Sequence, residues 1–325
     1  MPADKKLKIG VLTSGGDAPG MNAVIRAVVR TGIYHGMKVY GISRGYEGLL
    51  NAEVDELTTL NVRDIIHRGG TILRTARCPS MLKEEGQQRA ATVVKVLGLD
   101  ALVVIGGDGT FQGAASLSLL GVNIIAVPAT IDLDMACTEY TIGFDTAVNT
   151  GMENINKISD SSSSHERCSV VEVMGRDSGC LALWCSLTGG AEEVLIPEYR
   201  EVDNDAVIKQ IIHNRTHGKK HNLVVVAEGV GGSFKLSQEI EKVLGIEARA
   251  TTLGHLQRGG SPTAIDRMHG SVMGYMAVEA VLNGEVNKAV VVSGGKHILI
   301  DLDQALQIEK TYDHSLYEMI KVLAV

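Results

Sequence analysis

The chain has 325 residues, 45% of them hydrophobic and 21% charged, a composition typical of folded proteins and unlike that of disordered ones. With 31 Lys and Arg against 38 Asp and Glu, the net charge of −7 disfavours nucleic acid or an acidic membrane as the main partner. The length exceeds the roughly 250–300 residues at which single cores stop growing, so two domains are expected. There are 37 glycines against only 6 prolines, and we expect the excess glycine in turns where the backbone bends sharply or approaches a ligand.

The cysteines and the apolar runs indicate the compartment. The cysteines are odd in number and include no Cys-x-x-Cys pair, which favours thiols in a reducing compartment over disulfides or a zinc site. They are Cys78, Cys137, Cys168, Cys180 and Cys185. No apolar run approaches the about 18 residues of a membrane span, and the first residues do not resemble a signal peptide. We therefore expect a cytoplasmic protein without a membrane segment.

Short apolar, β-branched runs alternate with helical patterns along most of the chain. The runs predicted to form buried parallel strands are residues 7–12, 39–42, 101–105, 124–127, 169–174, 193–196, 223–227 and 289–293. After the first run, Met21, Val24, Ile25, Val28 and Val29 follow the spacing of a helix with one apolar face. This alternation predicts an α/β fold with mainly parallel sheets and ligands at the carboxyl ends of the strands.

A glycine-rich loop, TSGGDAPGMN at residues 13–22, connects the first predicted strand to this helix. Bare glycines let backbone N–H groups approach phosphate oxygens, and the start of a helix adds a favourable dipole. The loop lacks the Gly-Lys-Ser/Thr ending of a Walker A loop and the G-x-G-x-x-G spacing. A phosphate site and a tight strand–helix turn without a ligand both fit this segment.

A second loop, IGGDGTFQG at residues 105–113, again lies between a strand and a predicted helix. Its glycines surround Asp108, so the backbone can follow a polyphosphate while the carboxylate holds Mg²⁺ directly or through water. Turn chemistry alone rarely needs this glycine density. The Gly-Gly-Asp-Gly core occurs in several kinase families and does not name a substrate.

A third loop, PATIDLD at residues 128–134, follows the next strand. Asp132 and Asp134 are two positions apart, as solvated loop acids commonly are. They also suit a general base and a metal-associated acid, since a hydroxyl that attacks a phosphoryl group needs an acceptor for its proton.

Over nearly its whole length the sequence resembles the bacterial 6-phosphofructokinases. The resemblance rests on TSGGDAPGMN, IIHRGGTIL, TARC, VVIGGDGTFQGA, TIDLD, YTIGFDTA, SSHER, VEVMGR, TGGAE, VVVAEG and LGHLQRGGSPTAIDR, in this order. It implies two interleaved Rossmann-like α/β/α domains with mainly parallel sheets. The larger, ATP-binding domain would comprise residues 1–143 and about 257–307, and the smaller, fructose 6-phosphate-binding domain residues 144–256 and about 308–325.

The implied activity is transfer of a phosphoryl group from Mg-ATP to the 1-hydroxyl of fructose 6-phosphate, which gives fructose 1,6-bisphosphate and ADP in glycolysis. By motif, the ATP side would comprise Gly16, Tyr46, Arg77, Cys78, Gly107, Asp108, Gly109, Thr110 and Gly113, with Mg²⁺ at Asp108. The implied catalytic residues are Thr130, Asp132 as the general base, Asp134, and Arg176 on the transferring phosphoryl group.

The same resemblance implies a sugar-phosphate site that is shared between the subunits of a homotetramer. Its residues would be Thr130, Asp132, Asp134, Arg167, Met174, Gly175, Arg176, Glu228, Arg249, His255 and Arg258, with Arg167 and Arg249 reaching across from a neighbour. Simpler interpretations stay open for some of them. Arg176 and Arg249 also suit structural ion pairs, His255 a packed histidine and Arg258 a solvated loop.

Two departures from the family bear on the chemistry. Pyrophosphate-dependent relatives carry Asp at the position of Gly109 and Lys at that of Ala129, so the small residues here favour ATP over pyrophosphate. In the catalytic loop Leu133 replaces the usual Asn, and residues 135–137 are Met-Ala-Cys in place of Ile-Pro-Gly. Both carboxylates of the loop are retained, so we expect the chemistry to persist, and the effect of these replacements on the loop conformation stays open.

The family also implies an effector pocket for ADP or phosphoenolpyruvate between subunits. Arg26, Arg30, Glu192, Lys219 and Lys220 are retained, whereas Ser159 and His217 stand where the family has arginines. These changes predict weakened or altered allosteric control, although Arg26 and Arg30 also fit a solvated helix face.

Two further interpretations compete with an active phosphofructokinase. A catalytically weak regulatory or sensing paralogue conflicts with the joint retention of Asp108, Asp132, Asp134 and Arg176. A different Gly-Gly-Asp-Gly kinase, acting on NAD or a lipid, leaves the sugar-phosphate motifs of the second half unexplained.

Overall fold

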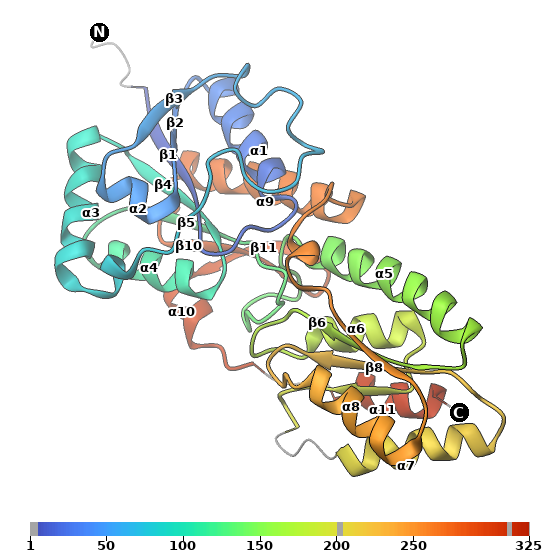
Figure 1. Cartoon of the computed structure of the whole chain (residues 1–325). Coiled ribbons are helices and arrows are strands. Elements are labelled where there is room, and N and C mark those ends of the chain that lie inside the picture. The colour runs from blue at the N-terminus through green and yellow to red at the C-terminus, as the bar shows by residue number, and fades with distance from the viewer. Residues whose placement is uncertain (1–5, 200–203, 311–313, 325) are drawn as a thin grey trace, which may run out of the picture. The chain divides into compact units, whose positions relative to one another are not determined.

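The computed structural model describes residues 6–199, 204–310 and 314–324, and divides the chain into two compact units (Figure 1). Unit 1 comprises the residues up to Thr130, Met135–Asp145 and Arg258–Lys310. Unit 2 comprises Ile131–Asp134, Thr146–Gln257 and the residues after Lys310. The chain therefore passes between the units several times, which explains why no single linker is visible in the sequence.

Unit 1 is built on a seven-stranded sheet with the order β11-β10-β5-β4-β1-β2-β3. The strands are β1 (Lys8–Ser14), β2 (Lys38–Ile42), β3 (Val54–Leu57), β4 (Ala101–Gly106), β5 (Ile124–Pro128), β10 (Lys288–Ser293) and β11 (Lys296–Asp301). The five central strands run parallel, and only the edge strands β3 and β11 are antiparallel to their neighbours. The fold class is therefore confirmed for this unit.

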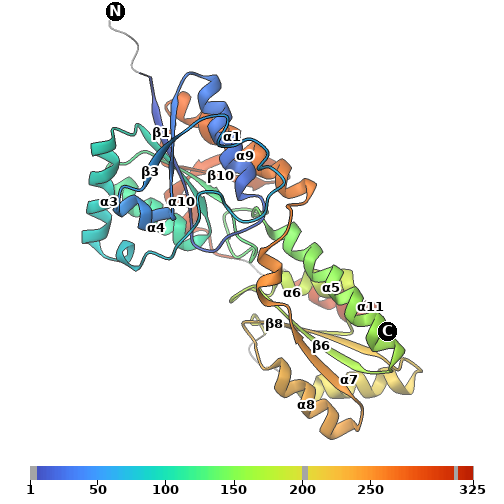
Figure 2. The ribbon, with the colours of Figure 1, turned by 45° about the horizontal axis from the view of Figure 1, so that its top comes forward.

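Unit 2 contains a four-stranded, all-parallel sheet with the order β7-β8-β6-β9. Its strands are β6 (Cys168–Val173), β7 (Glu193–Leu195), β8 (Asn222–Ala227) and β9 (Ala248–Thr252). Helices α7 (Asn204–Thr216) and α8 (Ser233–Leu244) lie on one face, and α6 (Cys180–Gly189) and α11 (His314–Leu323) on the other (Figure 2). A long helix, α5 (Phe144–Ser164), precedes β6.

All eight predicted strands are present, with ends that differ from the prediction by at most two residues. The three strands that the apolar runs did not predict are β3, β9 and β11. Each has exposed or half-buried positions along most of its length, so it carries no apolar run. The β10–β11 hairpin closes through Gly294 and Gly295, both at positive φ (56° and 70°), as a two-residue hairpin turn requires.

Helices cover both faces of the unit 1 sheet. On one face α1 (Met21–Tyr34) and α9 (Ala264–Leu282) lie side by side (Figures 1 and 2). The other face carries α3 (Glu84–Leu97), α4 (Asp108–Leu119) and α10 (Leu302–Gln307), with the short helices α2 (Gly45–Leu50) and η1 (Pro79–Leu82) nearby. The predicted apolar face of α1 is fully buried, and α9 covers much of the remainder of that helix.

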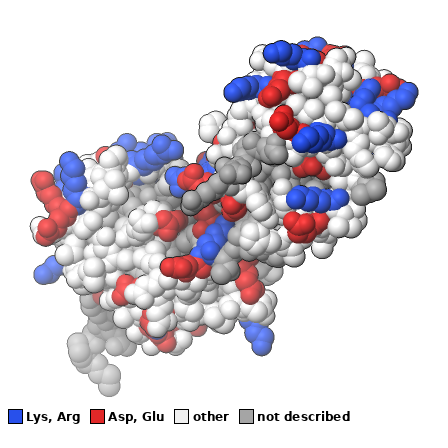
Figure 3. Space-filling view, turned by 90° about the horizontal axis from the view of Figure 1, so that it is seen from below, with Lys and Arg blue, Asp and Glu red and all other residues white. Residues whose placement is uncertain are grey.

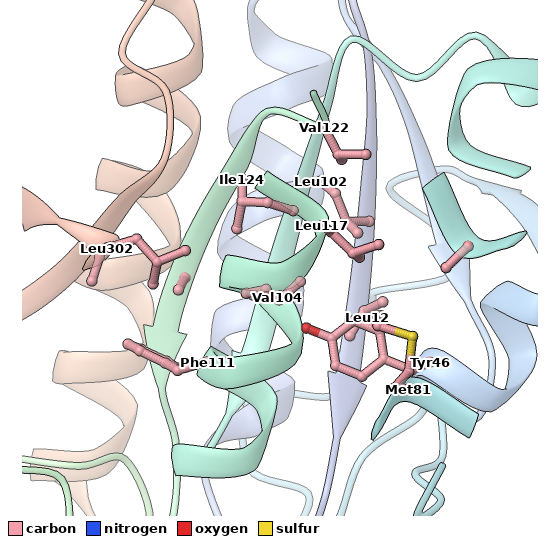
Figure 4. Packing of buried hydrophobic residues seen from close by; sticks show 14 of the residues in the cluster. Leu12, Tyr46, Met81, Leu102, Val104, Phe111, Leu117, Val122, Ile124 and Leu302 are labelled. Carbon is pink, nitrogen blue, oxygen red and sulfur yellow. The ribbon is translucent and has the colours of Figure 1, made fainter. Parts of the chain in front are cut away.

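The hydrophobic core under α4 places the second glycine loop. Phe111 and Leu117 of α4 pack with Val104 of β4, Ile124 of β5 and Leu302 of α10, and all five are fully or almost fully buried (Figure 4). Burying an aromatic or leucine side chain contributes about 1.5–3 kcal/mol. This packing holds the start of α4 against the carboxyl end of β4.

Over the described residues, the features of interest are the surface charges and the length and hydropathy of the helices. On the face shown in Figure 3, acidic and basic residues are interspersed, and no continuous basic field covers its described residues. Within the described ranges, no helix is both long enough and apolar enough to cross a membrane.

Two glycines of α9 let α1 approach closely. A methyl group at Gly274 would lie 2.7 Å from the Val24 carbonyl oxygen and 2.8 Å from Ala27 Cβ, and one at Gly270 would lie 3.0 Å from Ala23 Cβ. The atoms in the way belong to backbone or to a short side chain and cannot swing aside.

We therefore expect Gly274→Ala to destabilise the protein by about 1–3 kcal/mol, as overpacking does, despite alanine's helix propensity advantage of about 1 kcal/mol. Urea unfolding measures the change. Ser271→Ala on the same helix is the control and should unfold like the wild type. A Gly274→Ala variant as stable as the wild type would contradict the close packing.

Candidate functional site

The first glycine loop follows β1 and leads directly into α1. Gly15 (φ 85°) and Gly20 (φ 106°) adopt the left-handed conformation that glycine tolerates best, and Gly20 is the N-cap of α1. Thr75 donates its hydroxyl hydrogen bond to the Gly15 carbonyl over 2.7 Å. The loop is thus fixed by a side chain from another segment, and it ends at the start of helix α1.

The second loop meets the first because β1 and β4 are neighbours, with Ser14 paired to Gly106. The Thr110 hydroxyl donates to the Ser14 carbonyl over 3.0 Å. A methyl group at Gly106 would lie 2.5 Å from that same carbonyl oxygen, so a side chain there would force the two loops apart. The structure therefore brings both predicted phosphate loops to one sheet edge.

The exposed part of the second loop can take a cation and an anion. Asp108 is the exposed first residue of α4, and a methyl group at Gly109 would meet no atom within 4 Å. Gln112, one turn later, donates to the Asp108 carboxylate over 2.6 Å. Within the described ranges no group of three His, Cys, Asp or Glu side chains could hold a metal. Asp108 fits the way Mg²⁺ commonly binds, through one or two carboxylates plus substrate phosphates.

Tyr46, predicted for the ATP side, lies inside the core. It is 3% exposed, packs in the cluster with Leu12 and Met81 (Figure 4), and its hydroxyl donates to the Thr110 carbonyl over 2.7 Å. A methyl group at Gly113 would lie 2.8 Å from its ring. Burial raises the pKa of Tyr46 well above the usual range. Tyr46 therefore supports the second loop from beneath.

The other two residues predicted for the ATP side follow a loop that packs on β1. Arg77 is exposed and Cys78 half-buried. Burial and a hydrogen bond with Glu47 raise the pKa of the Cys78 thiol, so this thiol is not an activated nucleophile.

The third loop leaves the carboxyl end of β5, next to β4. The Ala129 N–H donates to the Gly106 carbonyl over 3.0 Å, and the Thr141 hydroxyl donates to the Thr130 carbonyl over 2.7 Å. A methyl group at Gly107 would lie 3.5 Å from Thr130 Cβ. The loops after β1, β4 and β5 therefore form one continuous edge in unit 1.

The third loop, predicted to be catalytic, continues into residues 131–134. Asp132 is buried, at 5% exposure, and Asp134 is half-buried. Leu133 between them has φ 46°, a left-handed conformation in which Asn is strongly favoured over branched side chains. The replacement of Asn by Leu noted in the sequence thus falls at a strained position.

Arg258 lies in unit 1 against the first glycine loop. Its guanidinium donates to the Asp17 carbonyl over 3.2 Å, and a methyl group at Gly16 would lie 2.7 Å from Arg258 Nη1. A side chain at position 16 would therefore displace the Arg258 guanidinium from its place against the loop. This contact joins a residue predicted for the sugar-phosphate side to one predicted for the ATP side.

Asn22, the last residue of the first motif, was not singled out by the sequence. It is 1% exposed, and its side-chain amide donates to the carbonyls of Arg68 and Gly69 while its oxygen accepts from the Ile72 N–H over 2.8 Å. Asn22 therefore shapes the HRGGT segment beside the first loop. Only the fold reveals this role, because the partners are about 46–50 positions away in the chain.

In unit 2, the predicted residues Met174, Gly175 and Arg176 form the loop after β6. Gly175 has φ 138° and Arg176 φ 53°. The Arg176 N–H donates to the Glu228 carboxylate over 2.7 Å, which places Glu228, from the end of β8, at the same edge. His255 is exposed and follows β9 by three residues. These residues gather at the carboxyl edge of the unit 2 sheet.

Arg167 and Arg249 lie at the other end of this sheet. Arg167 precedes β6, Arg249 is the second residue of β9, and both pair with the Glu247 carboxylate. The length of β6 separates them from Arg176 by roughly 20 Å along the strand. Glu247, which the sequence did not single out, pairs with both arginines, and hydrogen bonds from Arg249 and Arg167 lower the pKa of its carboxyl.

The residues predicted for the effector pocket are distributed over both units. In unit 2, Glu192 is 2% exposed and pairs with Lys219, while Lys220 pairs with Glu166 over 2.7 Å. In unit 1, Arg30 is exposed and Arg26 half-buried. Burial and the charge of Arg30 lower the pKa of Arg26. The Arg26 face of α1 is therefore only partly solvated.

Known proteins match the chain over most of its length. The family model described as Phosphofructokinase matches residues 8–281. The chain is 55% identical to an ATP-dependent 6-phosphofructokinase of Clostridium botulinum over 316 residues, which cover 97% of this chain and 99% of the relative. It is 54% identical to ATP-dependent 6-phosphofructokinase 1 of Clostridium perfringens, with the same coverage of both chains.

Solved structures agree with the sequence relatives. Phosphofructokinase from Saccharomyces cerevisiae superposes with a TM-score of 0.85 at 35% identity, and that from Pichia pastoris, in the T-state, with 0.87 at 36% identity. They cover 93% and 94% of this chain, which spans only 45% and 36% of theirs. A pyrophosphate-dependent phosphofructokinase from Marinobacter aquaeolei, at 22% identity and a TM-score of 0.83, shares the fold. On its motifs, its paired glycine loops and these matches, the chain belongs to the phosphofructokinase family.

Proposed function

We propose that the chain transfers the γ-phosphoryl group of ATP to the 1-hydroxyl of fructose 6-phosphate, giving fructose 1,6-bisphosphate and ADP in glycolysis. The observation that carries this proposal is the single edge formed by the loops after β1, β4 and β5. That edge combines two glycine loops with the carboxylate of Asp108. The segment that contains Asp132 begins at the same edge, directly after β5. The relatives named above are ATP-dependent 6-phosphofructokinases.

The chemistry assigned to the residues is in-line phosphoryl transfer. The sugar hydroxyl oxygen forms a bond to the γ-phosphorus while the bond to the ADP oxygen breaks, and Asp132 accepts the hydroxyl proton. Arg176 stabilises the charge on the transferring group, for which a planar guanidinium is suited. The backbone N–H groups of the glycine loops and the start of α4 bind the phosphates. Thr130 and Asp134 orient the acceptor.

A kinase of this type needs a divalent cation, for which we propose Mg²⁺ held by Asp108. When bound, the ion neutralises negative charge on the transferred phosphates. The exposed carboxylate at the start of α4 and the open space at Gly109 fit such an ion together with its nucleotide. That same open space supports ATP over pyrophosphate as the donor, because an Asp at this position would fill it.

We further propose that the sites are shared between subunits of a homotetramer that acts in the cytoplasm. Arg167 and Arg249 lie at the opposite end of β6 from Arg176, so they serve a sugar-phosphate site only if a neighbouring copy supplies them. Reducing conditions suit the chain, whose five cysteines are all free thiols.

An assay that compares ATP and pyrophosphate as phosphoryl donors tests the function. With fructose 6-phosphate and Mg²⁺, we expect turnover with ATP and at most a trace with pyrophosphate, measured by coupling the product fructose 1,6-bisphosphate to NADH oxidation. Turnover with neither donor would support the sensing paralogue instead. Faster turnover with pyrophosphate would overturn the donor assignment.

In the same assay, Asp132→Asn keeps the size of the side chain and removes the base. A positioned general base contributes about 10²–10⁴ in rate, so kcat should fall by that factor with a much smaller change in KM. A kcat within tenfold of the wild type would refute the base assignment.

The contact between Gly16 and Arg258 predicts a specific kinetic defect. In Gly16→Ala the new methyl group displaces the guanidinium, and losing one charge-assisted hydrogen bond of about 1.5–3 kcal/mol should raise the KM for fructose 6-phosphate about 10- to 100-fold. A double-mutant cycle with Arg258→Ala is the check. The two substitutions should not be additive, because both remove the same contact. Additive effects would show that Gly16 acts independently of Arg258.

We propose that anionic effectors act weakly on this protein, because Ser159 and His217 replace two arginines. Two lost charge-assisted contacts weaken an anion about 10²–10⁴-fold. We expect little inhibition by phosphoenolpyruvate at sub-millimolar concentration, and stronger inhibition in the double variant Ser159→Arg/His217→Arg. Strong inhibition of the unmodified protein at that concentration would contradict the proposal that anionic effectors act weakly.

A further inference from the structure

The loop that carries Arg176 has an unusual backbone conformation. Gly175 and Arg176 follow each other at positive φ, and Arg176 is not a residue type that favours this conformation. Within the loop, the backbone bond from the Ser178 N–H to the Gly175 carbonyl, at 2.9 Å, closes a turn. Side chains from elsewhere in unit 2 must therefore keep Arg176 in place.

Three acceptor side chains bind the N–H groups of this loop. The Met174 N–H donates to Gln257 Oε1 over 2.8 Å, and the Arg176 N–H donates to Glu228 Oε1 over 2.7 Å. The Gly179 N–H donates to both carboxylate oxygens of Glu198, over 2.8 and 3.1 Å. The loop is thus bound at its start, middle and end.

Gln257 differs from the other two because it is completely buried, at 0% exposure, whereas Glu228 and Glu198 are half-buried. Its Nε2 lies 3.5 Å from the Ala147 carbonyl of α5, to which it donates. A methyl group at Gly151, one turn further along α5, would lie 3.2 Å from Nε2. The amide is therefore clamped between α5 and the Arg176 loop, and it cannot reach a substrate.

Glutamine suits this position chemically. One end of its amide must accept from Met174 while the other donates to Ala147, and a carboxylate or an apolar side chain can do only part of this. Gln257 also directly precedes Arg258, whose guanidinium lies on the first glycine loop. The last two residues of the short helix η2 (Gly254–Arg258) therefore contact the Arg176 loop and the first glycine loop, respectively.

We propose that Gln257 is a positioning residue for phosphoryl transfer, which acts by fixing the backbone of the Arg176 loop. This inference rests on the role proposed above for Arg176. Without the bond to Met174, the loop loses its deepest anchor and Arg176 leaves the geometry in which it meets the transferring group.

Gln257→Leu tests the proposal, because it keeps the approximate volume and removes both polar contacts. We expect kcat to fall about 10- to 100-fold, the effect of one lost buried hydrogen bond on the barrier, while the KM for ATP changes less than about threefold. Ile240→Ala in the core of α8 is the matched control. It lowers the stability of the same unit, as urea unfolding measures, and should leave kcat near that of the wild type.

Gln257→Glu gives a readout that a merely structural role would not produce. A protonated Glu presents one C=O acceptor and one O–H donor, as Gln does, whereas an ionised Glu loses the donor and buries a charge. Burial raises the pKa of such a carboxyl. The ratio of variant to wild-type kcat should therefore be highest at low pH and fall as the pH rises through the raised pKa. This test remains available if Gln257→Leu does not fold.

The outcomes separate the inference from the proposed function. A loss of kcat in Arg176→Ala together with a Gln257→Leu kcat within threefold of the wild type would overturn the positioning role alone. An Ile240→Ala loss of kcat equal to that of Gln257→Leu at equal stability would also overturn it. An unchanged kcat in Arg176→Ala would overturn the proposed role of Arg176, and with it the basis of the inference.

Discussion

The close approach of β1 and β4 at their carboxyl ends is the constraint on which the candidate site depends. The absence of a side chain at Gly106 lets the Ser14 carbonyl come within reach of the Thr110 hydroxyl, and that one bond ties the two glycine loops together. The start of α4 lies at the same sheet edge where α1 begins. The phosphate site proposed at this edge uses backbone N–H groups together with locally placed arginines such as Arg258, so a net charge of −7 is compatible with an anionic ligand.

Support for the site comes from buried polar side chains in both units. In unit 1, Tyr46 reaches up from the core to the Thr110 carbonyl, and Asn22 satisfies three backbone groups of the neighbouring segment. In unit 2, Gln257 plays the corresponding part beneath the Arg176 loop. An unpaired polar group in the interior costs about 1–3 kcal/mol, so each of these side chains specifies one arrangement of its loop. Left-handed residues such as Leu133 and Arg176 persist only because their surroundings hold them in this way.

The arginines of unit 2 fall into two groups because a parallel strand has two distinct ends. Arg176 follows β6, whereas Arg167 precedes it and is joined to Arg249 by Glu247. A list of sequence motifs places all three in one site, but a strand of six residues separates them within one chain. Under the proposed function, a second copy of the protein would have to supply Arg167 and Arg249 to the site that contains Arg176.

The sequence by itself determined the α/β class, eight of the described strands and the glycine loops, because buried parallel strands are continuous apolar runs and their loops need glycine. It missed the strands β3, β9 and β11, since strands with exposed faces carry no such run. Only the tertiary structure decided that Tyr46 supports a loop from the core, that Gly16 makes room for Arg258, and that Gln257 and Glu247 belong to the site region. These relations join residues that are distant in the chain, and hydrogen bonding and close contact between such residues exist only after the strands have packed.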